Sequence, residues 1–394
     1  MAIGIEDISF YTTNQYIDLS VIAEKNGIDI DKFYVGIGQE RMSVLNPDED
    51  IVTMAAAAAL PIIENQDKNL INTLFFATES SVDQSKSAAV WLHKLLRLNS
   101  SCRVVELKQA CYSATCALHI ACALVAKTPQ YKVLIVASDV ARYDIGSSGE
   151  PTQGCGAVAM LISSKASILK IEHTTGMYTN DYMDFWRPNY RSTALVDGKY
   201  STKIYLQSLK SAWQDYQQNN GHDFSKFQYF CYHQPFTRMA EKAHIHLSKT
   251  VVQDIAANEI EEAIGITMLY NRLIGNSYTA SLYIAFISLL DHHRSEDLTG
   301  KRIGFFSYGS GCMAEFFSGV IQKDYHKKSH KKHHQSIINS RIPVSYQVYC
   351  DLHKEMVPSA EGNCIIPNTT TNQFRLTAIK NHKRIYEKTN FTKS

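Results

Sequence analysis

The segment LKQACYSATCALHIACALVAK, residues 107–127, combines small apolar side chains with three cysteines, Cys111, Cys116 and Cys122. It overlaps the end of RVVELK, residues 103–108, whose β-branched residues are typical of a buried strand. A strand that passes through a short turn into an apolar helix is the basic unit of an α/β fold. Three interpretations follow: a helix buried in such a fold, a membrane span, or a helix that carries a nucleophilic cysteine at its start.

The apolar run is too short and too interrupted for a membrane span. A span needs about 20 predominantly apolar residues. The run over residues 110–126 includes serine, threonine and histidine, and it is bracketed by Lys108 and Lys127. We therefore expect a helix that is buried on all sides within the protein.

Length and composition describe a protein large enough for two domains and of ordinary charge. The chain has 394 residues, of which 45% are hydrophobic and 20% charged, and its formal net charge is +2. A nucleic-acid-binding protein would be more basic. Residues 1–10, MAIGIEDISF, lack the basic and apolar regions of a signal peptide. The nine cysteines form no CxxC pair, which favours free thiols and the reducing cytoplasm.

Short runs of β-branched and aromatic residues alternate with helical patterns along the chain. Such runs predict buried strands, and apolar residues at intervals of three and four predict the helices between them. The alternation indicates βαβ units and a mostly parallel sheet covered on both faces. Asp48 or Asp50 is placed to cap the first of these helices. The predicted strands are 70–78, 103–108, 132–138, 157–163, 227–233 and 302–308, and the predicted helices besides 107–127 are 49–65, 86–98, 236–249 and 278–293.

Several predicted strands end in a polar or reactive residue at a turn. Glu79 follows FFAT and Cys111 follows ELKQA in the first half of the chain. His233 follows FCY in the second half, where FFSY also leads into a Gly-rich turn at 309–311. Ligands of open α/β sheets bind at the carboxyl ends of the strands, so we expect these residues to converge on one pocket. No sequence repeat is strong enough to prove a duplication.

Cys111 is the cysteine whose position suits a nucleophile. At a helix start, the helix dipole and free backbone N–H groups favour the thiolate and can also hold an oxyanion. Cys116 and Cys122 lie deeper in the helix, where we expect inert packing thiols. A cysteine nucleophile needs a nearby base or acid, which makes His233 and Glu79 candidates for that role.

Two polar features allow more than one interpretation. Asn276 precedes the predicted helix 278–293, where it caps the helix, binds a substrate carbonyl or orients His233. Residues 326–335, HKKSHKKHHQ, form a dense Lys/His run that suits a metal by composition. Because no Cys/His spacing of a zinc site accompanies this run, a solvated and mobile surface is the better interpretation.

Seven motifs occur together and in order along the chain. Together they are similar to those of bacterial 3-hydroxy-3-methylglutaryl-CoA (HMG-CoA) synthases, members of the thiolase superfamily. The resemblance extends from the N-terminus to about residue 322 and fades beyond it. The motifs are ATES (77–80), ACYSAT (110–115), GEPTQGCGAVAM (149–160), YMDFWRP (182–188), HQPFTR (233–238), GNSYTASLY (275–283) and FSYGSG (306–311).

The resemblance implies a fold and a reaction. The fold is a thiolase-like, five-layered αβαβα fold of two similar halves, 1–165 and 166–394, in a cytoplasmic homodimer. The reaction condenses acetyl-CoA with acetoacetyl-CoA and water to give HMG-CoA and CoA, a step of the mevalonate pathway to isoprenoid precursors. Coenzyme A thioesters are the substrates, and neither a cofactor, a metal, a nucleic acid nor a membrane is implied.

The resemblance also implies a role for each matching residue. Cys111 matches the acylated nucleophile, Glu79 the general acid/base that removes a proton from the acetyl group, and His233 the residue that polarises the ketone of the second substrate. Arg238 stands where bacterial relatives usually have lysine, so its grip on a CoA phosphate differs in geometry. The other matches are Tyr143, Thr152, Asp184, Phe185, Asn276 and Ser310 for substrate binding, and Arg238 and Lys242 for CoA binding.

Three rival functions share this fold. A relative that takes acyl groups from a carrier protein in polyketide β-branching has the same three catalytic residues, and bulk charge does not separate it from a CoA enzyme. A decarboxylating ketoacyl synthase needs no carboxylate, so Glu79 disfavours it. A catalytically silent binding module is disfavoured by the presence of Glu79, Cys111 and His233 together.

Overall fold

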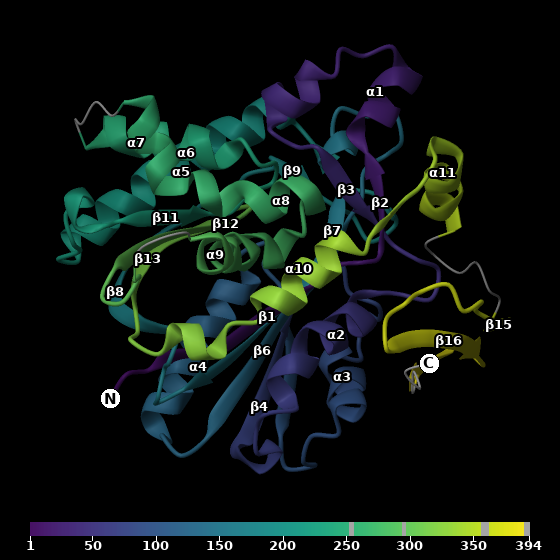
Figure 1. Ribbon diagram of the computed structural model, residues 1–394, viewed down its shortest axis with the longest axis horizontal. Coiled ribbons are helices and arrows are strands. Elements are labelled where there is room, and N and C mark those ends of the chain that lie inside the picture. Colours follow the sequence, from purple (N-terminus) through teal and green to yellow (C-terminus); the bar gives the residue numbers. More distant parts are fainter. Residues whose placement is uncertain (252–255, 294–296, 356–361, 390–394) are drawn as a thin grey trace.

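Nine strands form one sheet that runs through the molecule. The computed structural model describes residues 1–251, 256–293, 297–355 and 362–389 (Figure 1). The strands lie in the order β11 (Tyr229–Tyr232), β12 (Arg302–Gly309), β13 (Met313–Ile321), β8 (Leu169–Thr179), β1 (Gly4–Tyr11), β7 (Gly154–Ser163), β6 (Lys132–Ala141), β4 (Ile71–Ala77) and β5 (Arg103–Leu107).

The strand order repeats in two halves of this sheet. From β1 outward come β7, β6, β4 and β5, and from β8 outward come β13, β12 and β11. In both halves the first two pairings are antiparallel and the third is parallel. The halves join where Gly4 and Ile5 pair with Lys170 and Leu169. Two similar halves are thus present, and the boundary at residue 165 stays a prediction.

The expectation of a mostly parallel sheet is wrong. Five of the eight neighbouring pairs are antiparallel and three are parallel. Strands β1, β8 and β13, which the apolar runs did not predict, take part in four of the antiparallel pairs. These strands carry charged residues, such as Glu172 in β8, and therefore lack the continuous apolar run of a buried parallel strand.

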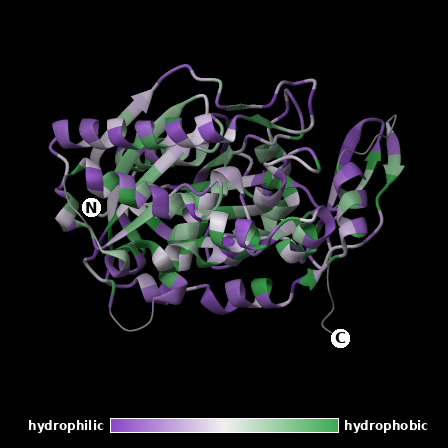
Figure 2. Cartoon of the chain, turned by 90° about the horizontal axis from the view of Figure 1, so that it is seen from above, coloured by the Kyte–Doolittle hydropathy of each residue, from purple (hydrophilic) through white to green (hydrophobic). Residues whose placement is uncertain are grey.

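The helices complete five layers, which confirms the αβαβα fold. Helices α4 (Ser113–Lys127) and α9 (Ser281–His292) lie between the two halves of the sheet, in one shared core cluster. Helices α2 (Ile51–Ile63) and α3 (Ala88–Leu96) cover the outer face of the first half. Helices α5 (Gly198–Gln218) and α6 (Met239–Thr250) cover that of the second half. Hydrophilic residues are concentrated on the outer helices (Figure 2).

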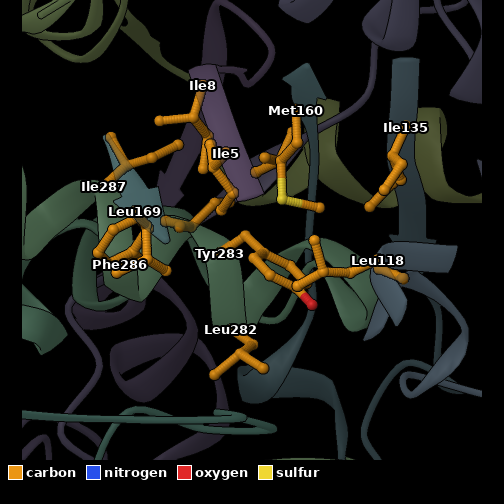
Figure 3. Packing of buried hydrophobic residues seen from close by; sticks show 14 of the residues in the cluster. Ile5, Ile8, Leu118, Ile135, Met160, Leu169, Leu282, Tyr283, Phe286 and Ile287 are labelled. Carbon is orange, nitrogen blue, oxygen red and sulfur yellow. The ribbon is translucent and has the colours of Figure 1, made fainter. Parts of the chain in front are cut away.

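The central layer shows why α4 is rich in small residues. Leu118 of α4 and Tyr283 of α9 face Met160 and Ile135 of the first half of the sheet (Figure 3). Two helices and two sheet faces meet here, so alanines allow their close approach. One face of α4 stays outside this core, with Ile120 39% exposed, so the expectation of burial on all sides is wrong.

The helical stretch 110–127 is long and apolar, as a membrane span would be. Within the described residues, 110–127 is the one helical stretch long and apolar enough to cross a membrane. Less than half of it, 44%, is buried inside the structure, but the buried face belongs to the main core with Ala114, Leu118 and Val125. A helix that holds two sheet halves together is a core helix.

The predicted helices and strands are present, and their ends lie within a few residues of the expected ones, except that the helix expected over 107–127 begins only at Ser113. Asp50 caps α2, as one of the two alternatives proposed, and accepts hydrogen bonds from the N–H groups of Val52 and Thr53. The helix predicted from 278 begins with a 3-10 turn at Tyr278–Ala280 and becomes α9 at Ser281.

The chain beyond β13 is folded and attached to the first half. Helix α10 (Lys331–Asn339) lies against β1, and β14 (Ile342–Pro343) pairs with β2 (Gln15–Asp18), itself paired with β3 (Arg41–Val44). Helix α11 (Tyr346–Glu355) follows. The remaining elements are α1 (Leu19–Asn26), α7 (Ala257–Ile264), α8 (Leu269–Ile274), β9 (Phe185–Trp186), β10 (Leu195–Val196), and the sheet of β15 (Asn363–Ile365), β16 (Phe374–Lys380) and β17 (Lys383–Lys388).

The Lys/His run at 326–335 is only partly a solvated surface. Nε2 of His330 lies 2.8 Å from Oδ1 of Asp7, and buried His334 places Nδ1 2.7 Å from Oδ2 of Asp291. The N–H of Phe10 donates to Nε2 of His334 at 3.3 Å. These contacts dock α10 on β1, so the expectation of a mobile surface is wrong for this part of the run.

Candidate active site

Cys111 and Glu79 are in contact at the carboxyl ends of two neighbouring strands. Sγ of Cys111 donates to Oε1 of Glu79 at 2.9 Å. Glu79 lies two residues after β4, and Cys111 lies four residues after β5, which is parallel to β4. Parallel strands end at the same edge of the sheet, so both side chains reach one point. The expected convergence is therefore present for this pair.

The surroundings of Cys111 hold its thiol protonated. Burial raises the pKa of Cys111 well above its ordinary value, and the carboxylates of Glu79 and Asp139 raise this pKa further. Helix α4 begins only at Ser113, and the N–H of Tyr112 is already bonded to Gln109 in a turn. The expected thiolate at a helix start is therefore wrong, because burial and two nearby carboxyl groups outweigh the helix dipole.

The pKa of Glu79 is influenced by burial, by a second carboxylate and by an arginine. Burial raises the pKa of Glu79 from 4.5 to about 8, and the charge of Asp139 contributes to this rise. The Cys111 thiol and the Arg187 guanidinium oppose the rise. Arg187 also donates to the backbone carbonyl of Glu79. A carboxyl group with this pKa both accepts and releases a proton near neutral pH.

Asp139 fixes the turn that carries Glu79. Its fully buried carboxylate accepts the N–H groups of Glu79 and Ser80, both at 2.9 Å, and the hydroxyl of Thr78 at 2.7 Å. Its other oxygen accepts the N–H of Thr279 at 3.1 Å, from the second half of the chain. Asp139 therefore joins the two halves directly beneath the site.

His233 directly follows β11 and is held as a neutral imidazole. Nδ1 of His233 lies 2.7 Å from Oγ of Ser281, and this Oγ also accepts the N–H of Gln234 at 3.3 Å. We assign the Ser281 hydroxyl as the donor to Nδ1, which leaves the proton of the ring on Nε2. Burial lowers the pKa of His233 from 6.5 to about 3. Among the described residues, Nε2 has no hydrogen-bond partner.

Tyr205 connects His233 with the nucleophile segment. Its hydroxyl donates to the carbonyl oxygen of His233 at 2.7 Å, and the two rings are stacked 6.5 Å apart. Burial first, and Cys111 second, raises the pKa of Tyr205. Tyr205 contacts His233 and lies close enough to Cys111 for the cysteine to influence its pKa, so the histidine and the cysteine border the same site.

Asn276 does not orient His233, since Ser281 does. Oδ1 of Asn276 accepts the N–H of Tyr278 at 2.8 Å, and the N–H of Asn276 donates to the carbonyl of Thr152 at 3.1 Å. Asn276 lies outside α9, whose N-cap is Ala280, so it does not cap that helix either. A side chain positioned to bind a substrate carbonyl stays as the third interpretation.

An aromatic wall stands beside the Cys111–Glu79 pair. Phe185 packs edge-on against Tyr143 at 6.2 Å and against Tyr278 at 5.7 Å. Burial raises the pKa of Tyr143, as do the neighbouring Cys111 and Glu79, whereas hydrogen bonds to Tyr278 and Thr152 lower it. The predicted substrate residues Tyr143, Thr152 and Phe185 are therefore brought together at the site.

The Gly-rich turn lies against the nucleophile segment. A Cβ atom on Gly309 would stand 2.4 Å from the carbonyl oxygen of Gln109 and 2.7 Å from Cβ of Tyr112, so only glycine fits. The carbonyl of Ser310 accepts a hydrogen bond from Gln109 at 3.4 Å. Fully buried Asp184 braces this turn through the N–H of Gly311 at 3.0 Å. Asp184 is thus a support of the turn rather than a residue open to substrate.

Arg238 is the N-cap residue of α6 and Lys242 lies in its first turn, beyond His233. Arg238 donates to the carbonyl of Val35 at 2.7 Å and pairs with Glu241 at 3.0 Å. Lys242 places Nζ 5.1 Å from the ring centre of Phe236. Both cations are available at the protein surface, but a phosphate has to compete with Glu241 for Arg238.

Asp139, Arg187 and Ser281 act in the site although the sequence interpretation did not single them out. Arg187 and Ser281 fall inside the motifs YMDFWRP and GNSYTASLY, which was the available signal. Asp139 follows the apolar run KVLIVAS, as Glu79 follows FFAT, and this abrupt carboxylate after a strand is the signal that identifies it. In the described part of the chain, no three His, Cys, Asp or Glu side chains gather as metal ligands would.

These features define a class of protein. A buried thiol paired with a carboxyl group, at the junction of two topologically repeated α/β halves, is the arrangement of a thiolase-like acyltransferase. The family model of the hydroxymethylglutaryl-coenzyme A synthase N terminal matches residues 1–167, and that of the C terminal matches residues 169–250 and 244–392. The chain belongs to the hydroxymethylglutaryl-CoA synthase family. Because the match continues to residue 392, the expected fading of the resemblance beyond residue 322 is wrong.

Known proteins agree with this assignment. The hydroxymethylglutaryl-CoA synthase of Enterococcus faecalis is 42% identical over 355 residues, which cover 89% of this chain and 91% of that protein. The polyketide biosynthesis 3-hydroxy-3-methylglutaryl-ACP synthase PksG of Bacillus subtilis is 32% identical over 368 residues, which cover 88% and 86%. A crystal structure of HMG-CoA synthase complexed with CoA has a TM-score of 0.93 and 38% identity, over 99% of this chain and 100% of that one.

Proposed function

We propose that the protein condenses acetyl-CoA with acetoacetyl-CoA and water to give HMG-CoA and CoA, in the mevalonate route to isoprenoid precursors. The observation that carries this proposal is the 2.9 Å contact between Sγ of Cys111 and Oε1 of Glu79. A thiol and a basic carboxylate in contact suit both acyl transfer to sulfur and proton removal from the resulting acetyl group. Membership of the family and 42% identity to a CoA-dependent synthase support the same substrates.

Acetyl transfer begins with the proton that the pair shares. Glu79 accepts the proton of Cys111 as the sulfur attacks the thioester carbonyl of acetyl-CoA. The C–S bond to CoA then breaks, and CoA leaves with that proton as a free thiol. The products are acetyl-Cys111 and CoA, and Glu79 is again a carboxylate.

Condensation uses the same carboxylate and the neutral histidine. Glu79 removes a methyl proton from acetyl-Cys111, and the enolate carbon bonds to the ketone carbon of acetoacetyl-CoA. His233, with a pKa lowered to about 3 by burial, polarises the ketone as an Nε2–H donor rather than as an imidazolium. The resulting alkoxide therefore takes its proton from Glu79, whose pKa of about 8 suits a donor. Water then hydrolyses the thioester and frees Cys111.

The remaining matched residues serve the substrates. Tyr143, Thr152 and Phe185 wall the acetyl group, and Asn276 and the backbone N–H of Ser310 donate to substrate carbonyls. Arg238 and Lys242 bind the phosphates of CoA, as their charge and their position at the start of α6 allow. Asp184 holds the Gly-rich turn in place for this purpose.

Mass spectrometry after mixing with acetyl-CoA tests the proposal. The wild-type protein gains one acetyl group on Cys111, and Cys111→Ala gains none. Cys116→Ala, five residues along the same segment, is the matched control and acetylates normally. An acetyl group on Cys116 or Cys122 instead of Cys111 would contradict the assigned nucleophile.

The competing substrate is an acyl group on a carrier protein, as the relative PksG suggests by its name. The same assay separates the two donors. Rapid acetylation by acetyl-CoA supports the proposed function. Acetylation by an acetylated carrier protein, with none by acetyl-CoA, would replace that function with the carrier-dependent reaction.

We further propose a cytoplasmic homodimer. All nine cysteines lie in the described residues as free thiols, which suits a reducing compartment.

The proposed dimer is supported by exposed apolar residues. Strand β5 forms an edge of the large sheet, and Val105 on it is 38% exposed. Ile120 on the open face of α4 is 39% exposed. An apolar sheet edge beside an apolar helix face suits pairing with a second copy of the chain. Light scattering measures the molar mass in solution and so distinguishes a dimer from a monomer.

A further inference from the structure

Helix α11 lies far along the chain from every proposed catalytic residue, yet it contacts the loop that carries two of them. Residues 142–153 connect β6 to β7 and bring Tyr143 and Thr152 to the site. Tyr349 and His353 are four residues apart on α11, so both lie on the same face of this helix. Both side chains are buried, at 3% and 9% exposure, and both face this loop.

His353 holds the backbone of Tyr143. Its Nε2 lies 2.9 Å from the carbonyl oxygen of Tyr143 and 3.3 Å from Oε1 of Gln153. A carbonyl only accepts, so Nε2 carries the proton and donates. Oε1 of Gln153 also accepts the N–H of Tyr143 at 2.7 Å. The peptide groups on both sides of Tyr143 are therefore fixed by His353 and Gln153.

Tyr349 fixes the far end of the same loop. Its hydroxyl donates to Oε1 of Glu150 at 3.0 Å and accepts from Nε2 of Gln153 at 2.7 Å. The other oxygen of Glu150 accepts the N–H of Gly146 at 2.7 Å. Glu150 and Gln153 flank Thr152 on both sides, so one tyrosine hydroxyl orients the segment that contains this threonine.

The helix is itself anchored at both ends. The Arg142 guanidinium donates to the carbonyl of His353 near the last turn of α11, where a cation is favourable. The chain before α11 pairs with β2 through β14. Tyr349 also packs in the apolar cluster of Leu19 and Phe33, on the side of the molecule that holds Arg238 through Val35.

We propose that α11 is a clamp for the acyl pocket, in which Tyr349 and His353 are positioning residues that hold Tyr143 and Thr152 against the Cys111–Glu79 pair. This inference deepens the proposed function and rests on it for its kinetic effect. Neither side chain reaches the reacting atoms, because the hydrogen bonds of both end on the loop. The C-terminal part of the chain thus becomes part of the active site's support.

Two variants of His353 separate clamping from simple folding. His353→Leu removes the donor and should accelerate amide hydrogen exchange over residues 142–153. It should also lower kcat/KM for condensation about tenfold, the equivalent of one lost hydrogen bond. His353→Gln keeps an N–H donor at a similar reach and should stay within about threefold of wild type. Val348→Ala, at a 44% exposed position of the same helix, is the control.

Tyr349→Phe supplies an independent arm, because it keeps the ring in its apolar cluster and removes only the hydroxyl. We expect faster exchange at Gly146 and around Thr152, with an unchanged melting temperature within about 3 °C. If His353→Leu and Tyr349→Phe leave both exchange and kcat/KM unchanged, or if His353→Gln fails as badly as His353→Leu, the clamp is refuted. If the wild type does not condense acetyl-CoA with acetoacetyl-CoA, the proposed function fails, and the exchange data alone decide whether α11 holds the loop.

Discussion

Replacing Glu79 by glutamine separates what this half-buried carboxyl group costs in stability from what it contributes to catalysis. Burial raises the pKa of Glu79 from 4.5 to about 8, so the folded protein holds the proton more tightly than the unfolded chain does. Between these two pH values the folded state binds more protons than the unfolded state. The free energy of unfolding of the wild type therefore falls as the pH rises through this window.

The expected magnitude follows from the same pKa. Each tenfold change in proton affinity corresponds to about 1.4 kcal/mol, so the rise sets an upper limit of about 5 kcal/mol above pH 8. Glu79 is partly exposed and accepts a hydrogen bond from Cys111, which reduces the expected effect to about 2–3 kcal/mol. We expect Glu79→Gln to be more stable than wild type by that amount at pH 9, and by less than about 1 kcal/mol at pH 5.

Urea unfolding followed by circular dichroism at pH 5, 7 and 9 measures this difference. Glu64→Gln, at an exposed carboxylate, is the control and should show no pH-dependent gain. Glu79→Gln should still accept an acetyl group on Cys111 but should form no HMG-CoA. A stability difference that does not grow with pH would refute the electrostatic argument, and near-normal condensation would refute the role of Glu79 as the base.

Three further changes test the surroundings of the pair. Arg187→Met should raise the pKa of Glu79 and slow condensation at pH 7 by about tenfold, with the acid limb of the pH–rate profile moved upward, because a cation that favours the carboxylate is lost. Asp139→Asn should move that limb downward and cost about 2–4 kcal/mol in urea unfolding, because one of its two accepting oxygens becomes an N–H₂ group that faces hydrogen-bond donors. In His334→Leu the melting temperature should fall less than in wild type as the pH drops below 6.5. Burial lowers the pKa of His334, so in the wild type the unfolded chain takes up the proton first and is favoured at low pH.

The sequence predicted the fold well where burial is uniform. Strand β4 and the part of β6 before Asp139 are nearly continuous apolar runs, and both were placed correctly. Strand β13 was missed because Glu315 interrupts its pattern, although this side chain is buried. Its partners are the hydroxyl of Tyr112 at 2.6 Å and His119 at 3.1 Å, some 200 residues earlier in the chain. Such compensation between distant residues is invisible to local patterns.

The positions of the catalytic residues were predictable, and their protonation was not. Glu79 and Cys111 follow two neighbouring parallel strands, so topology brings these two residues to one edge of the sheet. His233 follows β11 of the other half, which runs in the opposite direction, so it reaches the site only through the packing of the two halves. The pKa of Cys111 depends on which charges stand nearest, and Asp139 and Glu79 outweigh the start of α4. Likewise, burial decides that His233 is neutral, which a position at the end of a strand does not reveal.

The protonated thiol suits the order of the proposed steps. The hydrogen bond from Cys111 lowers the pKa of Glu79 in the resting site. Acetylation replaces that S–H by a thioester, so the carboxylate loses a donor and becomes a stronger base at the moment when it has to remove a methyl proton. The pKa of Glu79 read from enolisation of acetyl-Cys111, followed by deuterium exchange into the acetyl group, should therefore lie above the value read from the acetylation step. Equal values in the two steps would show that the thiol hydrogen bond does not tune the base.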